Sequence, residues 1–353
     1  MTASTISAII PVYNGLPELR ACLDSILAAA TRHGSTEVVV VDNGSTDGTL
    51  AVLDEYRHRP ALRILTHPRI SIGAVRNLGA RSASGTILAF IDSDCVIGTD
   101  HFVHMEDLIL RQGVSVTGLR VGLPQDPHWV EATWHELHDR WVDAPPYINS
   151  GNLAVTRSAY QAVGGFAEDL TTGEDAEFCA RLARAGFPSQ PSRLLGVQHL
   201  RNPQSVQAFF RKETWRGLGM FGTFRHSWID KPLLMTFAHG GLLVGALLVL
   251  TLLQTGWLGR LALAAGMVWL VPTAAVVYRF VETRRVTSPV PSLMLYQAYF
   301  LARLVALLWL ASGAGHGKQF GTGHAGGIKR SDAPELSGDP EGLPDRAADT
   351  APM

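Results

Sequence analysis

Short apolar runs alternate with helically spaced segments along the N-terminal part of the chain. Strands are expected at the apolar runs, residues 6–12, 38–41, 62–65 and 87–91. Helices are expected where apolar side chains recur three and four positions apart, at residues 18–30, 49–57 and 74–81. Continuous apolar runs are typical of strands that are buried on both faces. The alternation therefore predicts an α/β domain with a mostly parallel sheet and helices on both faces.

Polar residues gather where the expected strands end, which is where parallel sheets bind their ligands. Asp92 and Asp94 are separated by one small residue and could converge on a hard cation such as Mg²⁺ or Mn²⁺. The alternative is a capped turn, since Asp94 lies near the expected start of a helix. Asp42 opens the polar segment 42–49 and could accept hydrogen bonds from a nucleotide base; a turn followed by a helix N-cap is the alternative there.

A third acidic cluster lies further along the chain. Gly173, Glu174 and Asp175 open a segment that we expect to be helical. Acidic residues at a helix start are favoured by the helix dipole, so a purely structural role is an alternative to a chemical one.

The C-terminal part contains three long apolar stretches. We expect transmembrane helices at residues 233–254 and 259–279, joined by a short turn as a hairpin, because each is long enough to cross a bilayer. The third stretch, 293–312, is interrupted by Arg303. It either spans the membrane or lies in the interface with that side chain snorkelling. Buried core helices of a soluble protein are the less favoured alternative for the first two stretches.

Basic residues near these stretches predict the topology. Three follow the second stretch, Arg279, Arg284 and Arg285. By the positive-inside rule they belong in the cytoplasm, which places residues 1–230 there as well. Three more follow the third stretch, Lys318, Lys329 and Arg330. If these are also cytoplasmic, the third stretch does not cross, which is the interpretation we favour slightly. The N-terminal sequence has no features of a signal peptide. We expect a multi-pass protein of the cell membrane.

These features divide the chain into three regions. Residues 1–230 form the α/β domain, 231–312 the membrane region, and 313–353 a Gly-, Pro- and Ala-rich tail that we expect to be disordered. Within the first region, residues 203–230 are expected to be an interfacial helix region. Its basic and aromatic segment 206–220 could rest on anionic headgroups or near a diphosphate, and a solvated basic helix is the alternative.

Composition narrows the functional classes. The 30 Lys and Arg residues nearly balance the 31 Asp and Glu residues, which excludes a strongly basic nucleic-acid binder. Only 17% of residues are charged and 46% are hydrophobic, as the apolar stretches require. The three cysteines are too few and too scattered for a disulfide framework or a zinc site, which fits a reducing compartment.

Several short motifs follow one another in a fixed order. They are Pro11-Val12-Tyr13-Asn14, Asp42-Asn43-Gly44-Ser45, Arg76-Asn77, Asp92-Ser93-Asp94, Asn149-Ser150-Gly151-Asn152, Val163-Gly164-Gly165-Phe166 and Gly173-Glu174-Asp175. In order and spacing, this set resembles the family-2 glycosyltransferases, over about residues 5–220. The resemblance implies the GT-A fold, a Rossmann-like, mostly parallel sheet that binds nucleotide-diphosphate sugars.

The resemblance also implies a role for individual residues. Those implied to bind the nucleotide are Pro11, Tyr13, Asp42, Arg76 and Asp92. Those implied to bind a divalent cation, Mg²⁺ or Mn²⁺, are Asp92, Asp94 and His199. For His199, a purely structural role is the alternative. The catalytic residues are Asp175, which matches the general base, and its neighbour Glu174. Those that resemble the acceptor side of the pocket are Asn152, Gly165 and Phe166.

The implied reaction is an inverting transfer of one sugar, of the hexose type, from a nucleotide-diphosphate sugar. A UDP-sugar is expected as donor, and a lipid-linked or glycan hydroxyl at the cytoplasmic membrane face as acceptor, in cell-envelope glycan biosynthesis. The cation would neutralise charge on the leaving diphosphate, and Asp175 would take the acceptor's proton. Processive members carry a Gln/Arg-x-x-Arg-Trp signature. Residues 209–216 contain Trp215 but not that signature, so a single addition is expected.

Two other classes remain open as alternatives. A non-catalytic membrane scaffold could retain the nucleotide-binding fold, but it would be expected to have lost the acid pair or the base. A nucleotidyltransferase usually has a Gly-rich, basic loop after its first strand, whereas residues 13–19 contain no basic residue. The donor sugar, the acceptor and the oligomeric state are left open.

Overall fold

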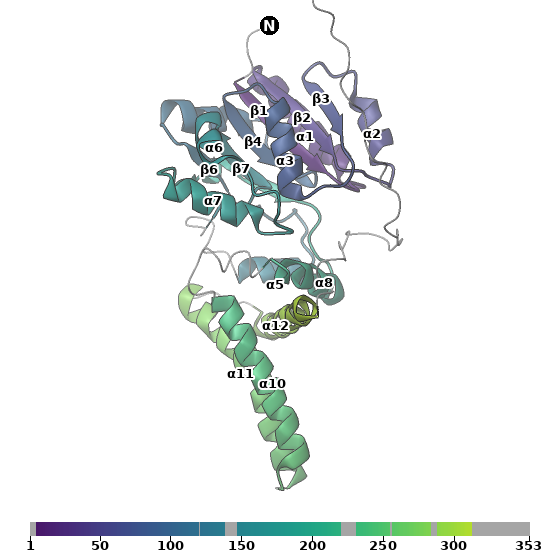
Figure 1. Cartoon of the computed structure of the whole chain (residues 1–353), viewed down its shortest axis with the longest axis vertical. Helices are drawn as coiled ribbons and strands as arrows, with labels where there is room; N and C mark the ends of the chain where they lie inside the picture. Colours follow the sequence, from purple (N-terminus) through teal and green to yellow (C-terminus); the bar gives the residue numbers. More distant parts are fainter. Residues whose placement is uncertain are drawn as a thin grey trace, which may run out of the picture. The chain divides into compact units, whose positions relative to one another are not determined.

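The structure is a computed structural model that describes residues 5–119, 121–137, 147–219, 231–254, 256–283 and 288–312. The described residues form a seven-stranded sheet in the order β3-β2-β1-β4-β7-β6-β8, covered by helices (Figure 1). Its strands are β1 Ile6–Val12, β2 Thr36–Asp42, β3 Leu62–Thr66, β4 Ile87–Ile91, β6 Val116–Gly118, β7 Asn152–Thr156 and β8 Ser189–Pro191. Two further short strands, β5 Cys95–Ile97 and β9 Val197–His199, form a separate antiparallel ribbon.

The sheet is mostly parallel, as its apolar runs predicted. β1 lies parallel to both β2 and β4, so that Ile9 stands opposite Val39 on one side and Phe90 on the other. β3 adds to the outer side of β2 in the same direction. β7 alone among these seven strands runs against its neighbours, between β4 and β6. The predicted fold class is confirmed.

Helices pack on both faces of the sheet and follow the predicted pattern closely. The helices of this region are α1 Leu19–His33, α2 Thr49–Tyr56, α3 Ile72–Ser82, α4 His101–Glu106, α5 Trp129–Glu136, α6 Arg157–Val163, α7 Glu174–Arg184 and α8 Val206–Gly217. On β1, Ile10 packs in one core with α1 and α4, whereas Ile9 packs in the opposite core with Phe178 of α7. Burial on both faces explains why the central strands are apolar at every position.

The turn after β4 differs from the sequence expectation. Asp94 is followed directly by strand β5, and the next helix, α4, begins only at His101. The alternative in which Asp94 belongs to a capped turn at a helix start is therefore wrong. Because β5 pairs with β9, Cys95 stands directly opposite His199.

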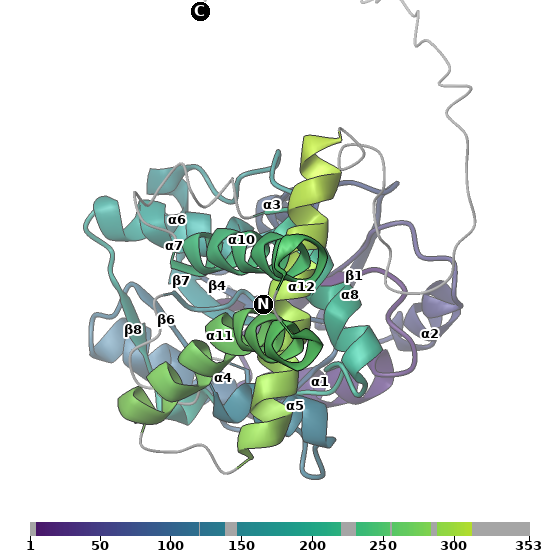
Figure 2. The same ribbon diagram turned by 90° about the horizontal axis from the view of Figure 1, so that it is seen from below.

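Three C-terminal helices are long and apolar enough to cross a membrane, judged by length and composition. They are α10 Lys231–Leu252, α11 Trp257–Thr283 and α12 Pro289–Ala311. α10 and α11 lie side by side, and α12 runs crosswise to them: it is seen end-on in Figure 1 and lengthwise in Figure 2. The predicted tail, 313–353, lies outside the described residues. So do the basic residues Arg284, Arg285, Lys318, Lys329 and Arg330.

α8 packs against α12 and α5 and is not a solvated basic helix. Phe209 of α8 shares an apolar cluster with Val130 of α5 and with Leu295 and Ala298 of α12. Glu213, one turn further along α8, is only 1% exposed. The solvated alternative is therefore wrong, because α12 covers the face that would have met water. Contact of this region with lipid headgroups stays a prediction.

Close packing of α3 on the sheet gives a test of this arrangement. A Cβ atom added at Gly79 would lie 2.5 Å from Cγ2 of Ile9 and 3.2 Å from Cγ2 of Val41. We expect Gly79→Ala to destabilise the domain by about 1–3 kcal/mol, because the helix must move away from β1 and β2. Thermal unfolding of the purified protein measures the effect. Gly98→Ala is the matched control, since no atom lies within 4 Å of the added Cβ there. Equal melting temperatures for the two variants would contradict this packing.

Candidate active site

The predicted site residues meet at the carboxyl edge of the sheet. β1, β2 and β4 are parallel, so their polar C-terminal continuations emerge along one edge, with Val12 opposite Asp42. β7 runs antiparallel to β4 and brings Asn152 beside Ile91, which directly precedes Asp92. The register of the sheet thus brings together in space side chains that are far apart in the sequence.

Arg76 of α3 joins two of the acidic clusters. Its Nη2 donates to Oδ1 of Asp92 at 2.8 Å, and its Nη1 donates to Oε1 of Glu174, at the start of α7, at 2.6 Å. The side chain is buried, which alone would lower its pKa, but Asp92, Glu174 and Asp175 together raise it. The guanidinium is therefore a fixed positive charge at the centre of the acidic residues.

Asp175 lies next to this ion-pair network. The residue is 8% exposed, its Oδ1 accepts a hydrogen bond from Ala176 N at 2.8 Å, and its Oδ2 accepts one from Ser150 N at 3.4 Å. Burial and the neighbouring Glu174 raise the pKa of Asp175 to about 7, while Arg76 acts against this rise. A carboxyl group that titrates near neutral pH is suited to accept a proton from a substrate.

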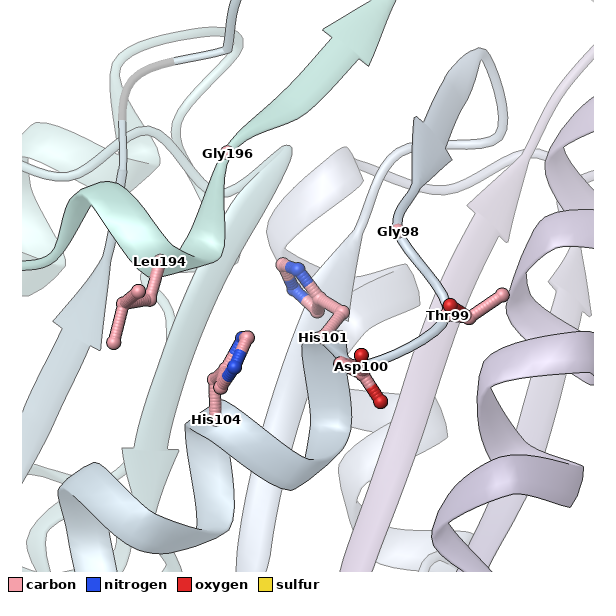
Figure 3. A pocket seen from close by; sticks show the side chains of 7 residues that line it. All are labelled: Gly98, Thr99, Asp100, His101, His104, Leu194 and Gly196. Atoms are coloured by element: carbon pink, nitrogen blue, oxygen red, sulfur yellow. The ribbon is translucent and has the colours of Figure 1, made fainter.

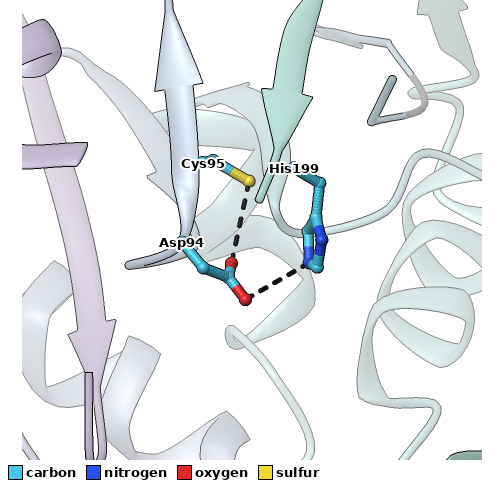
Figure 4. Close-up of side chains that lie close together, drawn as sticks. All are labelled: Asp94, Cys95 and His199. Atoms are coloured by element: carbon cyan, nitrogen blue, oxygen red, sulfur yellow. Dashed lines mark hydrogen bonds and ion pairs between the residues drawn. The ribbon is translucent and has the colours of Figure 1, made fainter. Parts of the chain in front are cut away.

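Asp94, Cys95 and His199 form a second cluster (Figure 4). His199 Nε2 lies 3.4 Å from Asp94 Oδ2, the Cys95 thiol lies 4.0 Å from Asp94 Oδ1, and the potential ligand atoms all lie within 4.8 Å of one another. Nδ1 of His199 is buried and has no hydrogen-bond partner within the described segments. Oxygen, nitrogen and sulfur donors at this spacing fit a divalent cation.

Burial acts on the protonation of this cluster in opposite directions. Burial, together with Asp92, raises the pKa of Asp94 to about 7. Burial and the positive charge of Lys212 lower the pKa of His199 to about 3, so the imidazole is neutral and able to act as a ligand. Asp92 itself is engaged by Arg76 and is 31% exposed at its side chain. Its implied role as a ligand stays a prediction.

The residues implied in nucleotide binding lie along the ends of β1 and β2. Asp42 is 1% exposed, and its Oδ2 accepts hydrogen bonds from Gly44 N at 3.1 Å and Ser45 N at 3.2 Å. The guanidinium of Arg69 lies over the Tyr13 ring, 3.4 Å from its centre. Pro11 is buried within β1, opposite Val41. The nucleotide-binding roles of these residues and of Arg76 stay predictions.

The turn at Gly165 and Phe166 is held by Asn77, whose role the sequence alone did not reveal. Asn77 Oδ1 accepts from Phe166 N at 2.9 Å, and its Nδ2 donates to Phe166 O at 2.9 Å. Gly165 has a φ of +79°, and an added Cβ would lie 2.6 Å from the Tyr160 hydroxyl. The Phe166 ring stacks on Phe178 at 4.2 Å. The sequence feature that could have indicated this role is a polar residue, Asn77, on the buried face of α3.

Asn152 lies deeper than its implied place beside the acceptor. It is fully buried, and its Nδ2 donates to the carbonyl oxygens of Leu119 at 3.1 Å and Leu195 at 2.5 Å. In the structure this amide ties β7 to two neighbouring segments. The acceptor-side roles of Asn152, Gly165 and Phe166 stay predictions.

Comparison with known proteins agrees with this geometry. The sequence model of the family described as Glycosyl transferase family 2 matches residues 7–161. The matched segment, which is less than half of the chain, is thus similar to family-2 glycosyltransferases. Glycosyltransferase AglE of Haloferax volcanii is 28% identical over 193 residues, which cover 53% of this chain and 64% of that protein. Validoxylamine A glucosyltransferase of Streptomyces hygroscopicus subsp. jinggangensis is 27% identical over 233 residues, covering 53% of each chain. The chain thus spans only part of the length of these relatives.

A solved structure shows the same fold. The mannosyltransferase PcManGT of Pyrobaculum calidifontis, in complex with GDP-Man and Mn²⁺, matches this structure with a TM-score of 0.58 and 20% identity, over 88% of each chain. The domain accordingly has the GT-A fold, with its sheet and covering helices as described above.

A surface hollow of the protein lies away from the predicted site residues (Figure 3). It is lined by Gly98, Thr99, Asp100, His101, His104, Leu194 and Gly196. Gly98 follows the end of β5, whereas Asp94 precedes its start, so the hollow and the Asp94 cluster lie at opposite ends of the ribbon. None of the predicted site residues lines it. The carboxylate clusters, and not this hollow, are the candidate active site.

Removing the central positive charge of the site, that of Arg76, gives the second test. We expect Arg76→Met to destabilise the domain by about 3–5 kcal/mol, because Asp92 and Glu174 lose the cation that offsets their burial. Arg81→Met is the control on the same helix: Arg81 is 62% exposed and lies 3.5 Å from the exposed Glu168, so we expect a loss below about 1 kcal/mol. Thermal unfolding distinguishes them. Similar losses in both variants would show that the Arg76 pairs are dispensable.

Proposed function

We propose that the protein transfers one hexose, with inversion, from a nucleotide-diphosphate sugar to a hydroxyl group of a lipid-linked or glycan acceptor. The observation that carries the proposal is Asp175: a buried carboxyl group with a pKa near 7, next to Arg76 and Glu174 and at the same sheet edge as the Asp94 cluster. Three further features support it, namely the family of the domain, the donor atoms at Asp94 and His199, and the apolar helices.

The residues divide the chemistry between two parts of the site. Asp175 accepts the proton of the acceptor hydroxyl as its oxygen forms a bond to the anomeric carbon. The bond from that carbon to the diphosphate breaks on the opposite face, so one displacement inverts the configuration. The backbone amides of Ser150 and Ala176 hold the base in place. Glu174 raises its pKa and Arg76 limits that rise. Asp94 and His199, with Asp92 beside them, would hold a divalent cation, which would supply charge neutralisation at the leaving diphosphate.

The membrane helices support an acceptor that is itself attached to lipid. We propose that the α10–α11 hairpin crosses the bilayer, that the crosswise α12 lies along the cytoplasmic surface, and that the catalytic domain is cytoplasmic. A catalytic domain tied to that surface meets lipid-linked acceptors at a high effective concentration. Such a reaction belongs to the assembly of cell-envelope glycans. The mannosyltransferase and the glucosyltransferase among the similar proteins support a hexose as the transferred group.

Binding of nucleoside diphosphates tests the donor site. We expect UDP to bind the purified full-length protein tightly only with Mn²⁺ present, because the diphosphate and the Asp94 cluster share the cation. Asp94→Ala should lose this binding. Asp100→Ala is the control, since that carboxylate is 50% exposed and lies at the far end of β5. Isothermal titration with UDP, GDP and dTDP measures both.

The outcome of these titrations distinguishes between the functional classes. Cation-dependent binding of GDP or dTDP in place of UDP would keep the reaction and change the donor. Absence of binding by any of the three would reject the donor site and leave the non-catalytic scaffold as the better description.

Substitution of the base tests the mechanism. We expect Asp175→Asn to lower kcat by about 10²–10⁴-fold while nucleotide binding persists, because only the proton acceptor is lost. In the unmodified enzyme kcat/KM should rise as the pH increases through about 7, since the ionised form of Asp175 is the active one and burial raises its pKa to about 7. Initial rates of sugar transfer at several pH values measure both effects.

A neighbouring carboxylate provides the control. Asp169 is exposed in the loop that leads to α7, and Asp169→Asn should keep both the rate and its pH dependence. Full transfer activity in Asp175→Asn would exclude Asp175 as the base.

A further inference from the structure

A buried ion-pair network links the apolar helix α12 to α8. Glu213 of α8 accepts a hydrogen bond from Arg216 Nη1 at 2.7 Å through Oε1 and one from Arg303 Nη2 of α12 at 2.8 Å through Oε2. The side chain of Glu213 is 2% exposed and that of Arg303 is 12% exposed. Burial alone would raise the pKa of Glu213, but Arg216 and Arg303 hold it below its usual value. Both oxygens of the Glu213 carboxylate thus accept hydrogen bonds from arginines.

Arg303 is the only charged residue between Pro289 and Ala311. Placing an arginine in an apolar helix costs free energy unless its charge is paired with another charge or reaches water. Here the charge is turned toward the protein, because Arg303 binds Glu213 and also lies over the Tyr299 ring, 4.9 Å from its centre. Apolar packing of Phe209 against Leu295 and Ala298 holds the two helices together around this pair. The single charge of α12 therefore serves its contact with α8.

α8 also carries basic residues that act on the acidic site. Lys212 and Arg216 are one turn apart and therefore lie on one side of the helix. The chain just after α8 reaches the loop before α7, since a Cβ added at Gly219 would lie 2.5 Å from Cγ2 of Thr172. In line with this proximity, Lys212 lowers the pKa of Asp94 and Asp175 raises the pKa of Arg216. The side chain of Arg216 is 41% exposed and remains accessible to a ligand.

These contacts form one chain of interactions from the membrane region to the site. Arg303 holds Glu213, Glu213 holds Arg216, and Arg216 and Lys212 add positive charge beside Asp94 and Asp175. A leaving diphosphate needs such cations, which stabilise the charge that develops on its oxygens. An arginine whose orientation is fixed by a carboxylate binds phosphate better than a mobile one, since less freedom is lost on binding.

We propose that Arg303 and Glu213 are positioning residues that hold Arg216, with Lys212 one turn before it on α8, against the diphosphate of the donor, so that tight donor binding requires α12 to be seated on α8. This inference rests on the proposed glycosyltransferase reaction. It assigns the arginine of the apolar helix to the donor site, although it touches neither the sugar nor the acceptor.

Comparison of diphosphates with monophosphates tests this role. Full-length protein with Mn²⁺ is titrated with UDP, GDP and dTDP and with the matching monophosphates. We expect Arg303→Met to weaken binding of the preferred diphosphate about tenfold or more and to leave its monophosphate within about twofold, because the cations act mainly on the additional phosphate. Arg303→Lys should recover part of the affinity. A purely structural role would weaken both nucleotides alike and would not be relieved by lysine.

Two further variants keep the test decisive. Arg260→Met is the control, because it removes an arginine from the first turn of α11, where Arg260 Nη1 donates to Leu250 O. The double variant Glu213→Met/Arg303→Met removes both members of the buried pair, a change that folded proteins often tolerate. It should fold and still lose diphosphate affinity, since Arg216 has lost its anchor.

Each outcome has a distinct meaning. A folded double variant with unchanged diphosphate affinity would overturn the positioning role and leave the proposed reaction intact. If the unmodified protein binds none of these diphosphates, the donor site itself is wrong and the positioning role is overturned with it.

Discussion

The site depends on the buried guanidinium of Arg76. Asp92, Glu174 and Asp175 approach one another at the sheet edge, and three carboxylates this close would repel each other without a cation among them. Arg76 pairs with two of them and limits the rise in the pKa of the third. It also connects α3, the turn after β4 and α7, so the correct charge distribution and the correct packing of these elements require the same side chain.

Around this centre the site has an acidic side and a basic side. The acidic side comes from the ends of β4 and β9 and from α7, which are parts of the sheet and its covering helices. The basic side comes from α8, which is held by α12 through Glu213. A ligand with a diphosphate and a cation is complementary to both. In the proposed function, the donor site is therefore assembled from the GT-A domain together with α8 and α12, although the matched family region ends at residue 161.

Sequence patterns predicted the parts of this structure that depend on burial, and not those that depend on a distant partner. The apolar runs of β1, β2 and β4 identified strands because both of their faces are covered. The three-residue strands β5 and β9 were missed because they are too short to show a period, and with them the proximity of Cys95 to His199. The resemblance supplied Asp175 and His199. The sequence of residues 206–220 did not indicate that α12 covers α8. An amphipathic pattern shows which face of a helix is buried and not which element buries it.

The crosswise orientation of α12 bears on which acceptors the proposed base could reach. In the topology proposed above, with the α10–α11 hairpin across the bilayer and α12 along its surface, the contact of α12 with α8 would fix the domain at one height above the lipid headgroups. The distance of Asp175 from the membrane plane would then be set by this packing and not by a flexible linker. The proposed transfer would select acceptors by how far their hydroxyl group projects from the bilayer, in addition to their chemical identity.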